Sequence, residues 1–267
     1  MRRFLLAGVV VALVAAAPAS AQTVPSSMAS LGDSITRATD VCCWYGDHPA
    51  QSWSTGGGVL DGIRSHYERL RALDPAIAGR NYNDARAGAR MRDAPAQAQA
   101  AVAQGAGYVT ILMGANDVCR TSRSAMTSAA DFRTQFTQTM DILATGLPAG
   151  SHVFVSSIPN VYRLWQVLHV NPVARLVWAA AGICQSLLAE SNAEADRQAV
   201  LAREVELNGV LADVCARYTL CRFDGGAIFD YPFASDQVSR LDYFHPNLAG
   251  QSVLASVTWQ HSWWGGA

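Results

Sequence analysis

Short, mostly apolar runs alternate along the chain with longer stretches in which apolar positions recur every three or four residues. Short runs of this kind are typical of buried β-strands, and the longer pattern is typical of amphipathic helices. The expected strands are residues 27–32, 81–85, 108–113, 152–158 and 222–229. Strand followed by helix, repeated, predicts an α/β fold with a mostly parallel five-stranded sheet between two helical layers.

One amphipathic helix is expected between the first two strands. Its apolar face would carry Val59, Leu60, Ile63, Tyr67, Leu70 and Leu73, and its polar face would carry mostly Arg64, Glu68, Arg69 and Arg71. This spacing predicts a helix that packs one face against the sheet.

The N-terminus has the pattern of an export signal. Arg2 and Arg3 precede an apolar run at 4–17, and Ala19-Ser20-Ala21 supplies small residues for cleavage. The run is shorter than the roughly 20 residues that span a bilayer, so we expect a removed signal peptide at 1–21 rather than stable membrane insertion. Residues 22–267 are then expected to form one secreted, extracellular domain.

Composition excludes several function classes. Half of the 267 residues are hydrophobic and the formal net charge is −1, so the chain can bury a full core but offers no basic surface for nucleic acid. All 20 basic residues are Arg. The lack of Lys excludes Schiff-base chemistry, the phosphate-binding loop of nucleotide hydrolases and Ser/Lys dyads.

Six cysteines follow the expected cleavage point, at positions 42, 43, 119, 184, 215 and 221. An even number in an exported chain predicts disulfides, and six cysteines allow 15 pairings. No C-x-x-C pair occurs, so a metal site is not expected. Adjacent cysteines rarely bridge each other, so we expect Cys42 and Cys43 to pair with other cysteines, one of them with Cys119. We also expect Cys215 to pair with Cys221.

Candidate chemistry lies after the strands, because ligands bind beyond the carboxyl ends of a parallel sheet. Ser34 follows the first strand, and its hydroxyl and backbone N–H would face the same point. Asp242 and His245 are three residues apart in a predicted turn, so the carboxylate can hold Nδ1–H of the imidazole and leave Nε2 as a general base. Pro246 would be the first residue of the last helix. Asp33 is expected to organise the turn without a chemical step of its own. The alternatives are an ordinary turn or a helix cap at Ser34, and a simple helix entry at 242–246.

Two further positions could stabilise an oxyanion. Asn116 follows an apolar strand in the segment Gly-Ala-Asn-Asp, and its amide can donate a hydrogen bond. Gly88 lacks a Cβ, so its N–H allows close approach of a substrate. Gly-Ala-Asn-Asp is equally consistent with a loop that ends a strand and starts a helix.

Taken in order, Gly32-Asp33-Ser34, Gly88, Gly114-x-Asn116-Asp117 and Asp242-x-x-His245-Pro246 resemble the four sequence blocks of the SGNH (GDSL-type) hydrolase superfamily. The resemblance implies a three-layer, flavodoxin-like α/β/α fold. It also implies a Ser34–His245–Asp242 triad with oxyanion donors from Ser34, Gly88 and Asn116. Ala38 departs from the pattern, because relatives often have Gly there. With its export signal and several cysteines, the chain most resembles extracellular actinobacterial members of this superfamily.

The resemblance implies a serine esterase or lipase that needs no metal or organic cofactor and acts through an acyl-enzyme on Ser34. Its expected partner is a small-molecule or lipid ester, and monomer is the default state. The alternatives are a carbohydrate acetyl or feruloyl esterase, a non-catalytic secreted binding protein, and a two-metal phosphoesterase. The two-metal alternative is weak, because this chain lacks the dense set of Asp and His residues that such sites require.

Two segments are candidates for substrate contact. The loop at 36–58 contains Trp44, Tyr45 and Trp53, and residues 162–188 are expected to form a helical pair. Trp165, Leu168 and Trp178 of that pair could line an acyl pocket, or they could belong to the core. An apolar pocket would favour acyl lipids or long-chain esters, and aromatic residues in an open cleft would favour esterified sugars.

Overall fold

The computed structural model describes residues 23–265, so the expected signal peptide at 1–21 lies outside the described residues. The five predicted strands form one sheet in the order β2-β1-β3-β4-β5, and all four neighbouring pairs are parallel. The strands are β1 (Met28–Gly32), β2 (Asn81–Asn83), β3 (Tyr108–Leu112), β4 (His152–Val155) and β5 (Cys221–Phe223). The predicted α/β class is therefore confirmed.

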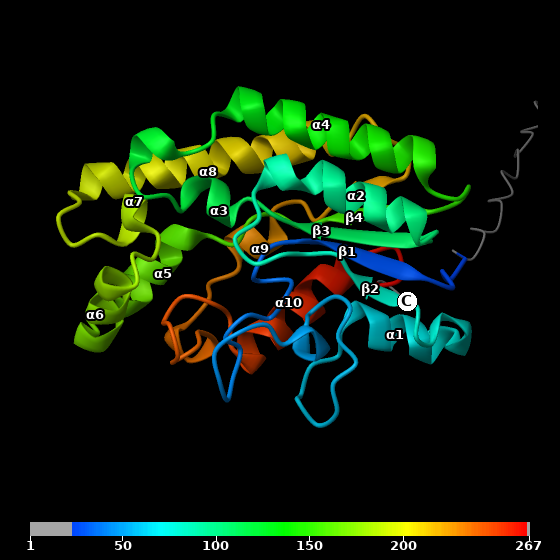
Figure 1. Cartoon of the computed structure of the whole chain (residues 1–267), viewed down its shortest axis with the longest axis horizontal. Helices are drawn as coiled ribbons and strands as arrows, with labels where there is room; N and C mark the ends of the chain where they lie inside the picture. Colours follow the sequence, from blue (N-terminus) through cyan, green and yellow to red (C-terminus); the bar gives the residue numbers. More distant parts are fainter. Residues whose placement is uncertain (1–22, 266–267) are drawn as a thin grey trace, which may run out of the picture.

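Helices cover both faces of the sheet (Figure 1). On one face lie α2 (Ala94–Ala103), α4 (Ala129–Gly146) and α8 (Glu194–Cys215), and on the other lie α1 (His66–Leu73) and α10 (Leu248–Gln260). The shorter helices are α3 (Ala115–Val118), α5 (Val161–Leu168), α6 (Pro172–Ala180), α7 (Gln185–Leu188) and α9 (Ala227–Asp230). The α5–α6 pair lies at the end of the molecule opposite to α1 (Figure 1).

The core explains why the central strands are mostly apolar, with Ser30 and Thr110 as buried hydroxyl residues. Every residue of β1 and β3 is buried, because both faces of these strands are covered by helices. Their register pairs Met28 with Tyr108 and Gly32 with Leu112, so both strands end at the same edge of the sheet. Residues that follow β1 and β3 are thereby brought together at that edge.

The helix expected from residue 59 begins later, at His66. Ser65 caps it by accepting a hydrogen bond from the N–H of Glu68, whose side chain accepts from the N–H of Ser65. Val59 and Leu60 are instead 84% and 101% exposed in the preceding loop. Left-handed backbone at Leu60 and Gly62 prevents a helix from passing through this segment. Ile63, Tyr67 and Leu70 are buried as predicted, but Leu73 is 55% exposed.

Other boundaries were also predicted wrongly. The second strand ends at Asn83 rather than at 85, and the fourth ends at Val155 rather than at 158. The fifth strand ends at Phe223 rather than at 229, because the buried Asp224 side chain accepts hydrogen bonds from the N–H groups of Gly226 and Ile228 and turns the chain into α9. The last helix begins at Leu248, capped by Asn247, so Pro246 precedes the cap instead of opening the helix.

The disulfides are partly as predicted. Cys215–Cys221 is confirmed, but Cys119 pairs with Cys184, which bridges the segments that follow α3 and precede α7. The prediction that Cys42 or Cys43 reaches Cys119 is wrong. Their sulfurs lie 2.7 Å from each other on a loop that is closed at its base by two hydrogen bonds between Asp40 and Gly46. Within residues 23–265, no helix has the length and apolar character needed to cross a membrane.

Candidate active site

Ser34 lies just beyond the carboxyl end of β1. The Asp33 side chain accepts a hydrogen bond from the N–H of Ile35 at 2.9 Å, which closes the turn that carries Ser34, as expected for Asp33. Gly32 exchanges two hydrogen bonds with the side chain of Gln97. A Cβ at Gly32 would lie 2.4 Å from Oγ1 of Thr36, so the tight turn requires glycine there.

The structure brings Ser34 together with the distant pair of residues near the C-terminus. Nε2 of His245 lies 2.8 Å from Oγ of Ser34, and Nδ1 forms a short hydrogen bond with Asp242. Asp242 also accepts hydrogen bonds from the N–H groups of Phe244 and His245. The imidazole is therefore held between a carboxylate and a hydroxyl, with Nε2 available to accept a proton from Ser34.

Electrostatics favour an ionised carboxylate beside the imidazole. Burial alone would lower the pKa of His245, but the hydrogen bond and the charge of Asp242 outweigh burial and raise it. Burial would raise the pKa of Asp242, and the hydrogen bond and charge of His245 hold it below its usual range instead. The imidazolium form is thus stabilised where proton transfer would produce it.

Asp33 has a different environment from Asp242. Burial raises its pKa to about 7, although the hydrogen bond from Ile35 and the charge of His245 lower it. Its Oδ2 is buried and has no hydrogen-bond partner among residues 23–265. Asp33 is therefore only partly ionised near neutral pH, whereas Asp242 is held as a carboxylate.

Two of the predicted oxyanion donors, Gly88 and Asn116, lie in neighbouring segments. Gly88 is exposed with a φ of +76°, and Asn116 lies in α3 with its Nδ2 donating to the carbonyl of Ala89 at 3.1 Å. Within residues 23–265, no hydrogen bond uses the backbone N–H of Ser34 or of Gly88. These two N–H groups and the second hydrogen of the Asn116 amide are thus available to a substrate oxygen.

Asp117 has a role that its position in the sequence did not reveal. Its buried carboxylate accepts hydrogen bonds from the N–H of Met91 and the hydroxyl of Thr127. Burial raises its pKa, and these hydrogen bonds oppose the rise. Because Met91 follows Gly88 and Asp117 follows Asn116, this side chain ties together the two segments that carry oxyanion donors.

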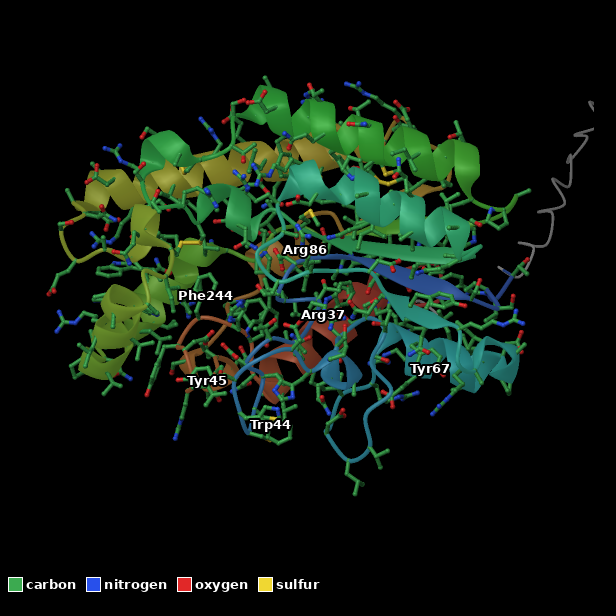
Figure 2. The ribbon with its side chains drawn as sticks, viewed as in Figure 1. Arg37, Trp44, Tyr45, Tyr67, Arg86 and Phe244 are labelled. Atoms are coloured by element: carbon green, nitrogen blue, oxygen red, sulfur yellow. A yellow bond between two sulfur atoms is a disulfide. The ribbon has the colours of Figure 1, made fainter. Side chains whose placement is uncertain are left out.

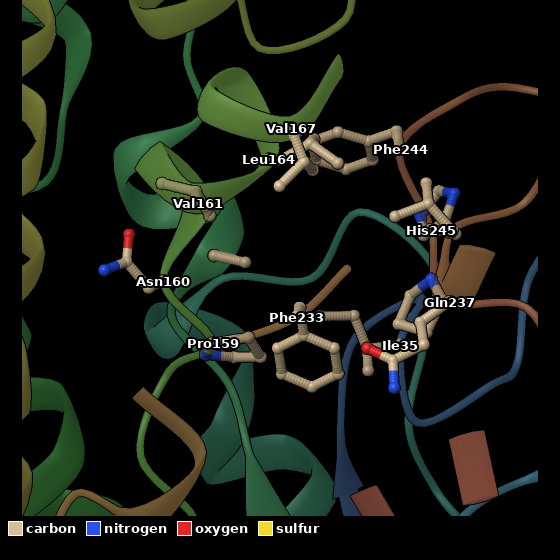
Figure 3. A pocket seen from close by; sticks show the side chains of 13 residues that line it. Ile35, Pro159, Asn160, Val161, Leu164, Val167, Phe233, Gln237, Phe244 and His245 are labelled. Atoms are coloured by element: carbon tan, nitrogen blue, oxygen red, sulfur yellow. The ribbon is translucent and has the colours of Figure 1, made fainter. Parts of the chain in front are cut away.

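An apolar pocket opens beside the imidazole (Figure 3). Val161, Leu164 and Val167 of α5 lie on one side and His245 on the opposite side. Phe233 and Phe244 add two aromatic rings to the apolar lining. The pocket therefore offers an apolar surface next to His245, whose Nε2 lies 2.8 Å from the hydroxyl of Ser34.

The helical pair predicted at 162–188 is present, but different residues line the pocket. Leu168 and Trp178 are buried in the core, and the ring of Trp165 packs under the guanidinium of Arg197 at 3.7 Å. The apolar spacing of α5 was a correct signal of a buried face. It could not show which of its residues meet the core and which meet a cavity.

The loop at 36–58 contributes a second surface. Trp44 and Tyr45 are 67% and 69% exposed, at the outer end of their loop below the sheet (Figure 2), and the Tyr45 hydroxyl donates to the carbonyl of Leu241. Trp53 is fully buried and donates to Thr36, so it belongs to the core. Two of the three aromatic residues thus lie on the surface near the segment that carries Asp242.

Comparison with known proteins identifies the family of this chain. Residues 28–257 match the sequence profile described as GDSL-like Lipase/Acylhydrolase. The chain belongs to this family. It is accordingly a carboxylic ester hydrolase. No curated protein sequence matches the chain.

Solved structures share the fold of this GDSL-like hydrolase. An α/β hydrolase, LAE5, from the metagenome of Lake Arreo, Spain, is 19% identical with a TM-score of 0.58, and the match covers 91% of this chain and 97% of that one. An extracellular lipase from Streptomyces rimosus is 19% identical with a TM-score of 0.50, covering 88% and 99%. A GDSL-like lipase candidate from Parabacteroides merdae is 16% identical with a TM-score of 0.50, covering 90% and 94%.

Proposed function

We propose that this GDSL-like hydrolase cleaves carboxylic esters through an acyl-enzyme on Ser34. The observation that carries the proposal is the hydrogen-bonded chain from Asp242 through His245 to Oγ of Ser34. Nε2 of His245 takes the proton as Oγ attacks the ester carbonyl, and Asp242 stabilises the imidazolium. The developing oxyanion accepts hydrogen bonds from the N–H groups of Ser34 and Gly88 and from the amide of Asn116.

The second half of the reaction uses the same groups. The imidazolium returns its proton to the departing alcohol, which leaves the acyl group on Ser34. His245 then deprotonates a water molecule that attacks the acyl-enzyme, and the imidazolium returns this proton to Oγ of Ser34 as the acid is released. The proposal needs no metal or organic cofactor for these steps.

The acyl group is proposed to enter the apolar pocket at α5. The side chains of Val161, Leu164, Val167, Phe233 and Phe244 support an apolar acyl chain, because burying each methylene contributes roughly 0.8 kcal/mol. Lipid or short-chain acyl esters are therefore the favoured substrates. The two disulfides support the related proposal of a secreted, extracellular enzyme.

Exposed Trp44 and Tyr45 favour a second candidate, a carbohydrate acetyl or feruloyl esterase that uses the same triad. Flat aromatic side chains at the edge of a site suit a sugar ring as the alcohol part of the ester. In the acetyl version of this alternative, the small acyl group would leave most of the α5 pocket unused.

The test is hydrolysis of a p-nitrophenyl ester series from acetyl to palmitoyl by residues 22–267 and by Ser34→Ala, with acetylated xylan as a further substrate. We expect Ser34→Ala to remove activity on every ester. An optimum beyond acetyl supports the acyl-ester enzyme, and preference for xylan supports the second candidate. Equal activity of both proteins would reject Ser34 as the nucleophile, and inactivity of both, with disulfides formed, would favour a binding protein.

A further inference from the structure

A third carboxylate lies beside the proposed triad. One carboxylate oxygen of Asp40, one of Asp242 and one ring nitrogen of His245 all lie within 4.8 Å of one another. Asp40 comes from the loop after Ser34 and belongs to none of the sequence blocks of the family resemblance. Both ring nitrogens of His245 already face Asp242 and Ser34, so the cluster is an electrostatic environment for the imidazole rather than a set of free metal ligands.

Hydrogen bonds hold Asp40 in place. Its Oδ1 accepts from the N–H of Gly46 at 2.6 Å, and its own N–H donates to the carbonyl of Gly46 at 2.8 Å. Its carbonyl accepts from the hydroxyl of Ser239, whose N–H in turn donates to the carbonyl of His245 at 2.8 Å. Its φ of 54° is left-handed, a conformation that Asp and Asn adopt more readily than most residues. Asp40 and His245 are therefore fixed relative to each other through Ser239.

Three acidic groups from three segments face the imidazole: Asp242, Asp40 and Asp33. Asp33 is fully buried, with its pKa raised to about 7, whereas Asp40 remains partly open to water. Burial and the neighbouring Asp242 raise the pKa of Asp40, and the N–H of Gly46 and the charge of His245 lower it. A carboxylate oxygen of Asp40 lies within 4.8 Å of a ring nitrogen of His245, so the negative charge of the ionised Asp40 favours the imidazolium.

We propose that Asp40 is a positioning residue of this hydrolase, whose carboxylate stabilises the imidazolium form of His245 in the transition state alongside Asp242. The inference rests on the proposed function, because it assigns His245 as the base that protonates during attack by Ser34. It adds a group that the family's triad does not include.

The test is Asp40→Asn, which keeps an oxygen acceptor for Gly46 and tolerates the left-handed backbone. Removing the negative charge destabilises the imidazolium, so the pKa of His245 falls. The acid limb of the kcat/KM profile, where activity is lost as His245 protonates, should then move to lower pH by about half a unit to one unit. We expect kcat on p-nitrophenyl acetate to fall by up to about tenfold with KM unchanged.

Asp47→Asn is the matched control, because Asp47 lies in the same part of the chain but accepts from Arg37 and Thr39 instead. It removes the same charge and should leave the profile unchanged. Retained activity in Ser34→Ala would reject the triad itself. An inactive Ser34→Ala together with an unshifted acid limb and unchanged kcat in Asp40→Asn would reject the role of Asp40 alone.

The unaltered protein gives a readout that does not depend on the folding of a variant. Followed by NMR, the carboxyl carbon of Asp40 should show a second inflection at the pH where the His245 ring titrates, because the two charges interact. The carboxyl carbon of Asp47 should show none. A single inflection for Asp40, at acid pH only, would overturn the proposal.

Discussion

Individual residues around the site occupy backbone conformations that most side chains avoid. Ala38 and Asp40 have φ values of 51° and 54°, and both lie on the turn and loop that follow Ser34. Relatives in the resembled family often have Gly at the position of Ala38, where a left-handed alanine costs roughly 1–2 kcal/mol. The Ala38 methyl is fully buried, so its packing offsets part of this cost. The chain beyond the nucleophile therefore follows a glycine-type turn without glycine.

Of the three predicted oxyanion donors, Asn116 donates through its side chain and the other two through the backbone. A substitution of Asn116 therefore tests the oxyanion site. We expect Asn116→Ala to lower kcat by roughly 10²- to 10³-fold with little change in KM, because its amide would stabilise charge that exists only in the transition state. The measurement is steady-state hydrolysis of p-nitrophenyl acetate, with thermal unfolding as a check on the fold. A loss confined to KM, or a loss below threefold in a stable variant, would assign Asn116 to its hydrogen bond with Ala89 instead.

At the scale of elements, α5 is the part of the structure that shapes the pocket. Its first N–H, on Val161, donates to both oxygens of Glu204 from α8, and the side chain of Asn160 caps the helix by accepting from Arg163. Glu204 is fully buried, and burial raises its pKa well above the usual value. A buried acid on the long α8 thus fixes the start of the helix that lines the pocket.

Leu164→Trp tests whether the α5 pocket holds the acyl chain. The larger ring would fill the space beside His245, so we expect hydrolysis of octanoyl and longer esters to fall by roughly tenfold to a hundredfold while acetyl ester hydrolysis is kept. Leu176→Trp is the matched control, because Leu176 is 69% exposed on α6. An unchanged chain-length profile in Leu164→Trp would place the acyl group elsewhere.

For the whole molecule, the two disulfides close loops of very different length. Cys119–Cys184 spans 65 positions and Cys215–Cys221 spans 6. Constraint of the unfolded chain then contributes about 4 kcal/mol for the long loop and about 2 kcal/mol for the short one. The long bridge also joins the segment that follows α3 to the segment that precedes α7, and α3 itself contains Asn116.

Replacing each bridge separately with two alanines should show this difference. We expect Cys119→Ala with Cys184→Ala to lower the free energy of unfolding by about 2 kcal/mol more than Cys215→Ala with Cys221→Ala. The measurement is urea unfolding followed by circular dichroism. Equal losses for the two double variants would mean that native-state packing, rather than loop length, sets the contribution of the bridges.

The sequence by itself determined the sheet, the family and the residues that meet at the centre of the site. Central strands buried on both faces must be apolar runs, and residues after parallel strands must share one edge, so Ser34, Gly88 and Asn116 could be placed from order alone. The three-residue offset of Asp242 and His245 was local and therefore visible. Secretion, one domain at 22–267 and the monomeric state stay predictions.

The tertiary structure decided the features that depend on which distant segments touch. Cys119 pairs with Cys184 because the segments beside α3 and α7 meet, and no spacing along the chain encodes that contact. The start of α1 depended on left-handed backbone at Leu60 and Gly62, which overrides apolar periodicity. Asp40 reaches His245 through a closed loop pinned by Ser239. Periodicity reports which face of an element is buried, whereas only packing determines what that face is buried against.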